Sequence, residues 1–83
     1  MSRIVNRPIH VNRIDDKGRP LAYTDAEGTE HRITDYLDEW REMGDWIRDE
    51  GERVMYRVLT ADMALLELEH RWDDAWLVYR VFD

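Results

Sequence analysis

Arginines interleaved with aromatic residues are the feature of this sequence best suited to chemistry. The two groups consist of Arg53, Tyr56 and Arg57, and of Trp76, Tyr79 and Arg80. On neighbouring strands such side chains can stack on single-stranded bases, and each stacked base contributes about 1–3 kcal/mol. A structural role ranks above this hypothesis, because aromatic rings at alternate strand positions fill a core and arginine stems lie over them.

A second candidate surface lies in the middle of the chain. Its members are Trp40, Arg41, Met43, Trp46 and Arg48. Tryptophan and arginine are the usual anchors of protein interfaces. Residues 25–50 carry ten acids against three arginines, so this surface is strongly acidic. A small domain also leaves some tryptophan exposed without any partner, but the combination favours a protein-binding site.

The sequence lacks the residue patterns that most enzymes and metal sites need. There is no cysteine, Ser2 is the only serine, and the four glycines are isolated, which argues against nucleophilic chemistry and phosphate-binding loops. His10, His31 and His70 are too far apart for a local metal motif. We therefore predict no catalytic residues, no metal and no cofactor. An enzyme would require a concave pocket with two titratable groups within hydrogen-bond reach.

The C-terminal half has the clearest secondary-structure pattern. From Val54 to Val58 apolar and polar side chains alternate with a period of two, and residues 64–69 repeat the alternation with one wetter face. Residues 75–82 are apolar on both faces, which is typical of a strand that is covered on both sides. Together these segments predict a three-stranded antiparallel meander.

The N-terminal third predicts two further hairpin connections. One turn falls at residues 15–18 and the other at 25–28, and each ends in a glycine that can take a positive φ. Residues 29–33 then resume an extended pattern. This part of the chain therefore adds more strands to the sheet.

One segment fits two structures. One face of a short helix around residues 34–43 would carry Ile33, Tyr36, Leu37, Trp40 and Met43. A long strand with a bulge near Tyr36 and Leu37 would also place Ile33, Leu37 and Trp40 inward, and we favour it because bent strands close small barrels. The predicted fold is mainly β, a small antiparallel barrel or strongly curled sheet of about six strands and SH3-like size. The alternative is an α+β fold with the helix packed on an antiparallel sheet.

Length and charge limit the possible roles. A chain of 83 residues buries only about 60% of its unfolded surface, so residues 1–83 are expected to form a single domain. The net charge of −7 repels a nucleic-acid backbone on average, so contact with one would need a local basic patch. No apolar run has the length of a signal peptide or a membrane span, and we expect a cytoplasmic location.

Glycines, tryptophans and the C-terminal run form a pattern between Ile9 and Asp83. It consists of Gly18-Arg19-Pro20, Tyr23, Gly28, Arg32-Ile33, Leu37, Trp40-Arg41, Gly44, Trp46, Arg53, Tyr56 to Thr60, Leu66-Glu67-Leu68 and Trp76 to Asp83. The pattern resembles that of a bacterial family of unknown function, found as stand-alone proteins or beside or fused to homologues of error-prone Y-family DNA polymerases. The resemblance implies a setting in mutagenic DNA repair. Met63, Ala64 and Phe82 depart from the pattern, which has a glycine in that turn and more often a tyrosine at the last position.

These observations predict a non-catalytic interaction module that binds a protein. An accessory role in DNA repair or translesion synthesis is the setting that the resemblance implies. The alternatives are direct single-stranded nucleic-acid binding through the Arg and aromatic strand face and, less favoured, a small enzyme. The candidate binding residues are Trp40, Arg41, Trp46, Arg53, Tyr56, Arg57 and Arg80.

Overall fold

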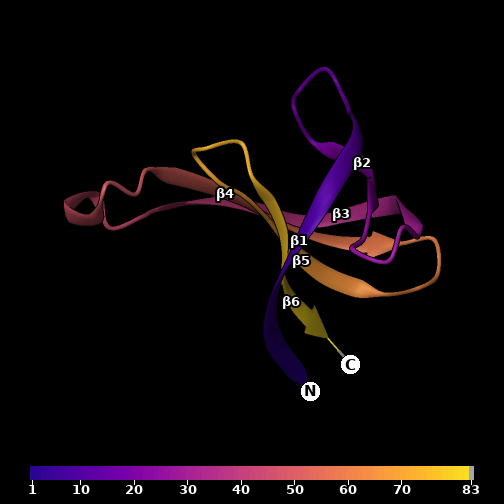
Figure 1. Ribbon diagram of the computed structural model, residues 1–83. Coiled ribbons are helices and arrows are strands. Elements are labelled where there is room, and N and C mark those ends of the chain that lie inside the picture. The colour runs from indigo at the N-terminus through magenta and orange to yellow at the C-terminus, as the bar shows by residue number, and fades with distance from the viewer. Residues whose placement is uncertain (83) are drawn as a thin grey trace.

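The computed structural model describes residues 1–82, except for the side chain of Trp46. Within these residues the chain forms six strands and one short 3-10 helix. The elements are β1 (Ser2–Ile14), β2 (Pro20–Thr24), β3 (Glu30–Met43), η1 (Trp46–Arg48), β4 (Glu52–Thr60), β5 (Leu65–His70) and β6 (Trp76–Phe82). Each strand pairs antiparallel with the next, and β6 pairs with β1, so the sheet closes into a barrel (Figure 1). The predicted mainly β fold is confirmed, and the alternative with a helix at residues 34–43 is wrong.

Two long strands close the barrel by changing partners along their length. β1 pairs with β6 over residues 2–9 and with β2 over residues 10–14. β3 pairs with β2 over residues 30–32 and with β4 over residues 33–43. A strand that serves two neighbours in this way must bend, because the sheet twists from strand to strand.

The bend in β3 explains why its sequence imitates a helix. The register with β4 shifts twice, between Ile33 and Asp35 and between Tyr36 and Asp38. Each shift changes the face on which the following side chains lie. Ile33 and Tyr36 therefore both pack against the core, although their spacing is that of a helix. The predicted bulge near Tyr36 and Leu37 is confirmed. The prediction that Leu37 and Trp40 turn inward is wrong, because Leu37 is exposed and the register shifts put Trp40 beside Arg57 on the opposite face.

The predicted turns at residues 15–18 and 25–28 are built in the same way. In each turn the carboxylate of the first residue, Asp15 or Asp25, accepts hydrogen bonds from backbone amides two and four residues later. The glycine that ends each turn has a φ of 82° or 84°, which a residue with a Cβ adopts only at a cost. These turns fix the ends of β1, β2 and β3.

Buried side chains of β2, β4, β5 and β6 fill the barrel. They are Tyr23, Tyr56, Val58, Leu66, Leu68 and Val78. The predicted C-terminal meander is confirmed, and β6 is covered on both faces because Leu77 and Val78 are both buried. In the β4–β5 turn Met63 has a φ of 66°, a conformation that a residue with a Cβ adopts only at a cost.

The β3–β4 hairpin continues beyond the barrel as a projecting arm, which we define as residues 41–53 (Figure 1). The two strands stay paired as far as Met43 and Glu52, and η1 lies at the far end. β5 pairs with β4 only from Val54 onward. The arm is therefore a two-stranded ribbon without a third strand beside it.

Candidate functional site

Four of the seven predicted binding residues lie together on the outer face of the sheet formed by β3 to β6. With two glutamates of β5 they form a surface that we name the arginine face, which consists of Trp40, Arg53, Arg57, Glu67, Glu69 and Arg80. Alternation along β4 turns Arg53 and Arg57 outward and the intervening Tyr56 inward. Tyr56 is buried in the core and cannot present a binding surface.

The two glutamates of the arginine face are buried. Glu67 and Glu69 are only 3% and 1% exposed, although the sequence pattern placed them on the wetter face of their strand. Each carboxylate lies between two guanidinium groups, Glu67 between Arg57 and Arg80, and Glu69 between Arg53 and Arg71. The shortest of these contacts joins Arg57 Nη2 to Glu67 at 2.9 Å. Buried charges persist only when they are paired in this way.

Aromatic rings cover the same guanidinium groups. The Arg57 guanidinium lies 5.7 Å from the ring centre of Trp40 and 5.5 Å from that of Phe82. Arg80 lies over Phe82 and Tyr79 at 6.0 and 5.8 Å. Such contacts contribute about 0.5–1 kcal/mol at exposed sites. The planar groups on which single-stranded bases would stack are thus already in contact with one another.

Trp40 links the arginine face to the arm. Its indole Nε1 donates to Glu42 Oε2 at 2.7 Å, and Arg53 donates to the other carboxylate oxygen at 3.1 Å. The hydrogen bond from Trp40, followed by that from Arg53, holds the pKa of Glu42 below its ordinary value despite the opposing effect of burial. Trp40 therefore anchors the base of the arm.

The tip of the arm, residues 44–51, has a restrained backbone. Gly44 donates to the carbonyl of Gly51 at 2.9 Å across the base of the loop. Asp45 accepts three amide hydrogen bonds from residues 47–50 through its backbone and side-chain oxygens. These hydrogen bonds within the loop restrain its backbone.

Large apolar side chains stand out at this end of the molecule. Ile47 is 87% exposed and Met43 is 68% exposed. Arg41, a predicted binding residue, is also exposed and pairs with Glu52 at 3.2 Å. The side chain of Trp46, another predicted binding residue, lies outside the described part of the chain. The arm thus carries exposed apolar surface that the barrel does not cover.

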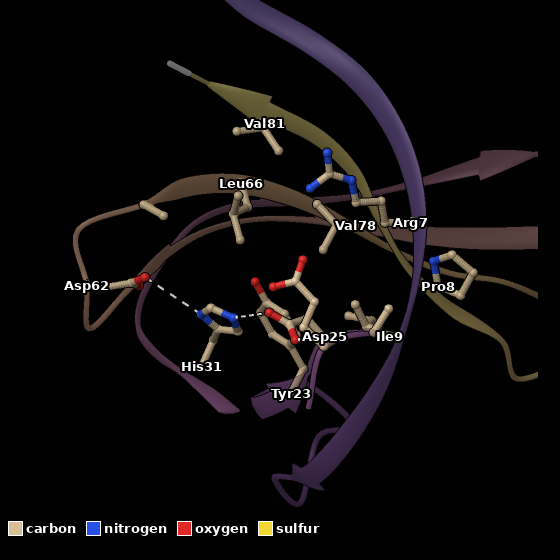
Figure 2. Close-up of a pocket in the computed structure, with 13 residues that line it drawn as sticks. Arg7, Pro8, Ile9, Tyr23, Asp25, His31, Asp62, Leu66, Val78 and Val81 are labelled. Atoms are coloured by element: carbon tan, nitrogen blue, oxygen red, sulfur yellow. Dashed lines mark hydrogen bonds and ion pairs between the residues drawn. The ribbon is translucent and has the colours of Figure 1, made fainter. Parts of the chain in front are cut away.

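A cavity of about 430 Å³ opens into the barrel on the side opposite the arm (Figure 2). Apolar side chains from β1, β5 and β6 form one wall, among them Ile9, Leu66, Val78 and Val81. Polar side chains from the β2–β3 and β4–β5 hairpins form the other. Closure of the sheet between β1 and β6 brings these segments together.

His31 is held between two aspartates in the polar wall. Its Nε2 lies 2.8 Å from Asp25 Oδ2, and its Nδ1 lies 3.7 Å from Asp62 Oδ2 (Figure 2). The ring stacks on Tyr23, its cross-strand partner, with the ring centres 4.9 Å apart. The hydrogen bond from His31, with those from backbone amides, holds the pKa of Asp25 below its ordinary value.

This cavity has the two titratable groups within hydrogen-bond reach that the enzyme hypothesis requires. Nε2 of His31 is hydrogen-bonded to Asp25, whereas Nδ1 lies 3.7 Å from the largely exposed Asp62, beyond hydrogen-bond distance. Burial, and then the charges of Asp62 and Asp25, raise the pKa of Tyr23 to about 12, which keeps its hydroxyl neutral. The described residues that line the cavity include no serine or threonine.

Sequence reasoning missed the cavity because its residues come from distant segments. Tyr23 and His31 face each other across the predicted turn at 25–28, and this pairing was the one usable signal. Asp62 reaches His31 through the β3–β4 pairing, whose register the sequence does not give. Arg7 reaches the cavity from β1, more than twenty residues from His31.

The described residues contain neither a cluster of metal ligands nor a membrane-spanning helix. No three histidine, aspartate or glutamate side chains gather as metal ligands within residues 1–82. The same residues contain no helix that is long and apolar enough to cross a membrane. The arginine face, the arm tip and the cavity are therefore the surfaces to weigh.

Comparison with known protein families, curated proteins and solved structures finds no match for this chain. The resemblance to the polymerase-associated family stays a prediction.

Proposed function

We propose that this chain is a non-catalytic protein-binding module that docks through the tip of its arm. The exposure of Ile47 and Met43 carries the proposal, because two large apolar side chains stand in water at the end of a projecting hairpin. Single exposed apolar residues are common on protein surfaces, but these two lie beside a loop with a restrained backbone. A restrained loop loses little conformational entropy on binding, so its contacts contribute more fully to affinity.

The arginine face supports this role by holding the base of the arm. Arg53 joins Glu42 on the arm to Glu69 in the barrel, with both contacts at 3.1 Å. Trp40 adds its hydrogen bond to Glu42. A firmly anchored base fixes the direction in which the tip projects.

The charge of the tip indicates the chemistry of the partner. The tip carries Asp45, Asp49 and Glu50 against Arg48 alone, and Arg48 lies 3.5 Å from Asp45. Interfaces select partners by complementary potential. The partner should therefore present an apolar pocket with a basic rim.

The resemblance noted in the sequence supplies the first partner to test. We propose an accessory role in DNA repair or translesion synthesis, in which the arm tip contacts a Y-family polymerase homologue from the same genome. The resemblance supports this setting, whereas the exposed arm tip supports protein binding in any setting.

Site-specific photo-cross-linking tests the docking surface. A photoreactive residue replaces Ile47 in one variant and Lys17, in the exposed β1–β2 turn, in the control. We expect position 47 to cross-link a discrete protein that position 17 does not. The purified partner should then bind wild type about tenfold more tightly than Ile47→Asp, a difference of about 1.4 kcal/mol.

Two results would overturn the proposal. One is equal affinity of the purified partner for wild type and Ile47→Asp. The other is cross-linking at position 47 that is no stronger than at position 17. Capture from cells counts in favour only once the purified pair has been shown to bind.

A further inference from the structure

An unpartnered hydroxyl marks the cavity opposite the arm. The Tyr23 side chain is only 4% exposed, and its hydroxyl makes no hydrogen bond within residues 1–82. The hydroxyl oxygen is not among the fully buried unpaired atoms, so it opens onto the cavity and its solvent. In Figure 2 the ring lies behind His31, and its hydroxyl end points toward Leu66 and the cavity. A ligand group in the cavity would supply the missing partner.

The size and apolar wall of the cavity suit a small organic molecule. Its volume of about 430 Å³ lies within the usual range for ligand pockets, roughly 300–1,000 Å³. Leu66 and Val78 are buried in the barrel, and Ile9 packs against the same core. This wall is therefore preformed and gives an apolar body a place to pack.

Negative charge dominates the polar wall. Asp25, Glu27 and Asp62 line the cavity against the single guanidinium of Arg7. The oxygens of Asp25 are engaged by His31 and by backbone amides. The Glu27 carboxylate has no partner among the described residues. Asp62 accepts a hydrogen bond from the Thr60 hydroxyl through Oδ1, while its Oδ2 lies 3.7 Å from His31 and the side chain is largely exposed. Two carboxylates thus keep acceptor capacity for a ligand.

We propose that this cavity binds a small organic cation, an amine with an apolar or aromatic body. The ammonium group donates to Asp62 with Glu27 nearby, the body packs on Leu66 and Val78, and the Tyr23 hydroxyl gains a hydrogen bond. An anion of the same shape would meet more carboxylates than guanidinium groups. The site is separate from the docking surface, because the arm and the turns around the cavity lie on opposite sides of the barrel (Figure 1).

Three probes of similar shape and different charge test the proposal. Phenethylamine, phenethyl alcohol and phenylacetate are titrated into isotope-labelled protein, and backbone amide shifts are followed by NMR. We expect the amine to shift the backbone amide signals of Tyr23, His31 and Leu66. It should also bind about tenfold more tightly than the alcohol, because its ammonium group makes a charge-assisted hydrogen bond. Added salt should weaken the binding of the amine and leave that of the uncharged alcohol unchanged.

Substitutions separate this site from non-specific attraction. Asp62→Asn should weaken amine binding about tenfold and Tyr23→Phe about fivefold, the loss of one hydrogen bond. Arg7→Gln should strengthen amine binding, whereas it would weaken an anion. Arg41→Gln is the control, because it also removes one arginine charge but does so on the arm, far from the cavity. It should leave the affinity for the amine unchanged.

Several outcomes would overturn the proposal. These are equal affinity for amine and alcohol, tighter binding of phenylacetate, or no shifts in cavity residues at millimolar amine. Because Asp62 is exposed, Asp62→Asn should fold normally even if Tyr23→Phe does not. Unchanged amine affinity in Asp62→Asn and Tyr23→Phe together would also exclude the site.

Discussion

The β3–β4 hairpin passes through two environments, and its side chains take different roles in them. Within the barrel β5 lies beside β4, and the outward Arg57 reaches the buried Glu67. In the arm there is no third strand, and Ile47 at the tip stands in water. Residue type alone would have given both regions the same role. The neighbouring strand decides whether a polar or apolar side chain stabilises the fold or stays available to a partner.

The largest expected effect lies on the arginine face. Glu69→Gln leaves Arg53 and Arg71 without the carboxylate they share. Removing one member of a buried ion pair costs about 3–5 kcal/mol, and the partial exposure of both arginines lowers the expected loss to about 2–3 kcal/mol. Urea unfolding measures it.

Glu52→Gln is the matched control. It removes the same charge from an exposed pair with Arg41 at the arm. We expect a loss below about 0.5 kcal/mol, as for most surface ion pairs. If Glu69→Gln and Glu52→Gln lowered the free energy of unfolding equally, the ion pairs of the barrel and of the arm would contribute equally to stability, which would contradict this account.

Acid should weaken the contacts of Glu42 at the base of the arm, where the arm joins the barrel. The folded pKa of Glu42 lies below its ordinary value of 4.5, so its contribution is complete above that value and is lost as pH falls through the folded pKa. Glu42→Gln should cost about 0.5–1 kcal/mol at pH 7, because the pair is partly exposed. The free energy of unfolding of the Glu42→Gln variant should then fall less than that of wild type between about pH 5 and 3. Parallel pH profiles of urea unfolding would contradict this assignment.

A smaller change sharpens the role of Trp40. Trp40→Phe keeps an aromatic ring beside Arg57 but removes the indole donor to Glu42. The pKa of Glu42 should rise toward its ordinary value and remain below it, because Arg53 still donates. NMR titration of the Glu42 carboxyl measures the shift. An unchanged pKa would mean that Trp40 does not anchor the arm.

The smallest expected signal concerns nucleic acid. Arg57 and Arg80 are paired with Glu67 and in contact with aromatic rings, so we expect no tryptophan quenching when a single-stranded oligonucleotide is added at low salt. Quenching that disappears at high salt would restore the nucleic-acid hypothesis. It would also show that paired arginines can still bind a ligand.

The strands could be predicted where alternation is unbroken. From Val54 to Val58 every second side chain enters the core, so the meander followed directly from the sequence. β3 was harder, because two register shifts give Ile33 and Tyr36 a helical spacing. The bent strand was favoured correctly, but which face Leu37 would occupy depended on where each shift falls.

The candidate sites were less predictable because they depend on contacts across the sheet. Glu67 and Glu69 look like surface residues until arginines from neighbouring strands cover them. Asp62 meets His31 because the β3–β4 pairing sets the end of β4 beside the start of β3. Residue types identified the arginines and tryptophans worth weighing, but pairing between strands determined their roles.

Urea unfolding of Ile47→Asp beside wild type tests the central claim that the arm tip is free surface rather than part of the fold. A charge placed on a side chain that is 87% exposed should change the free energy of unfolding by less than about 0.5 kcal/mol. A loss of about 2 kcal/mol or more would show that Ile47 is packed in the native protein, and the proposed docking surface would not exist.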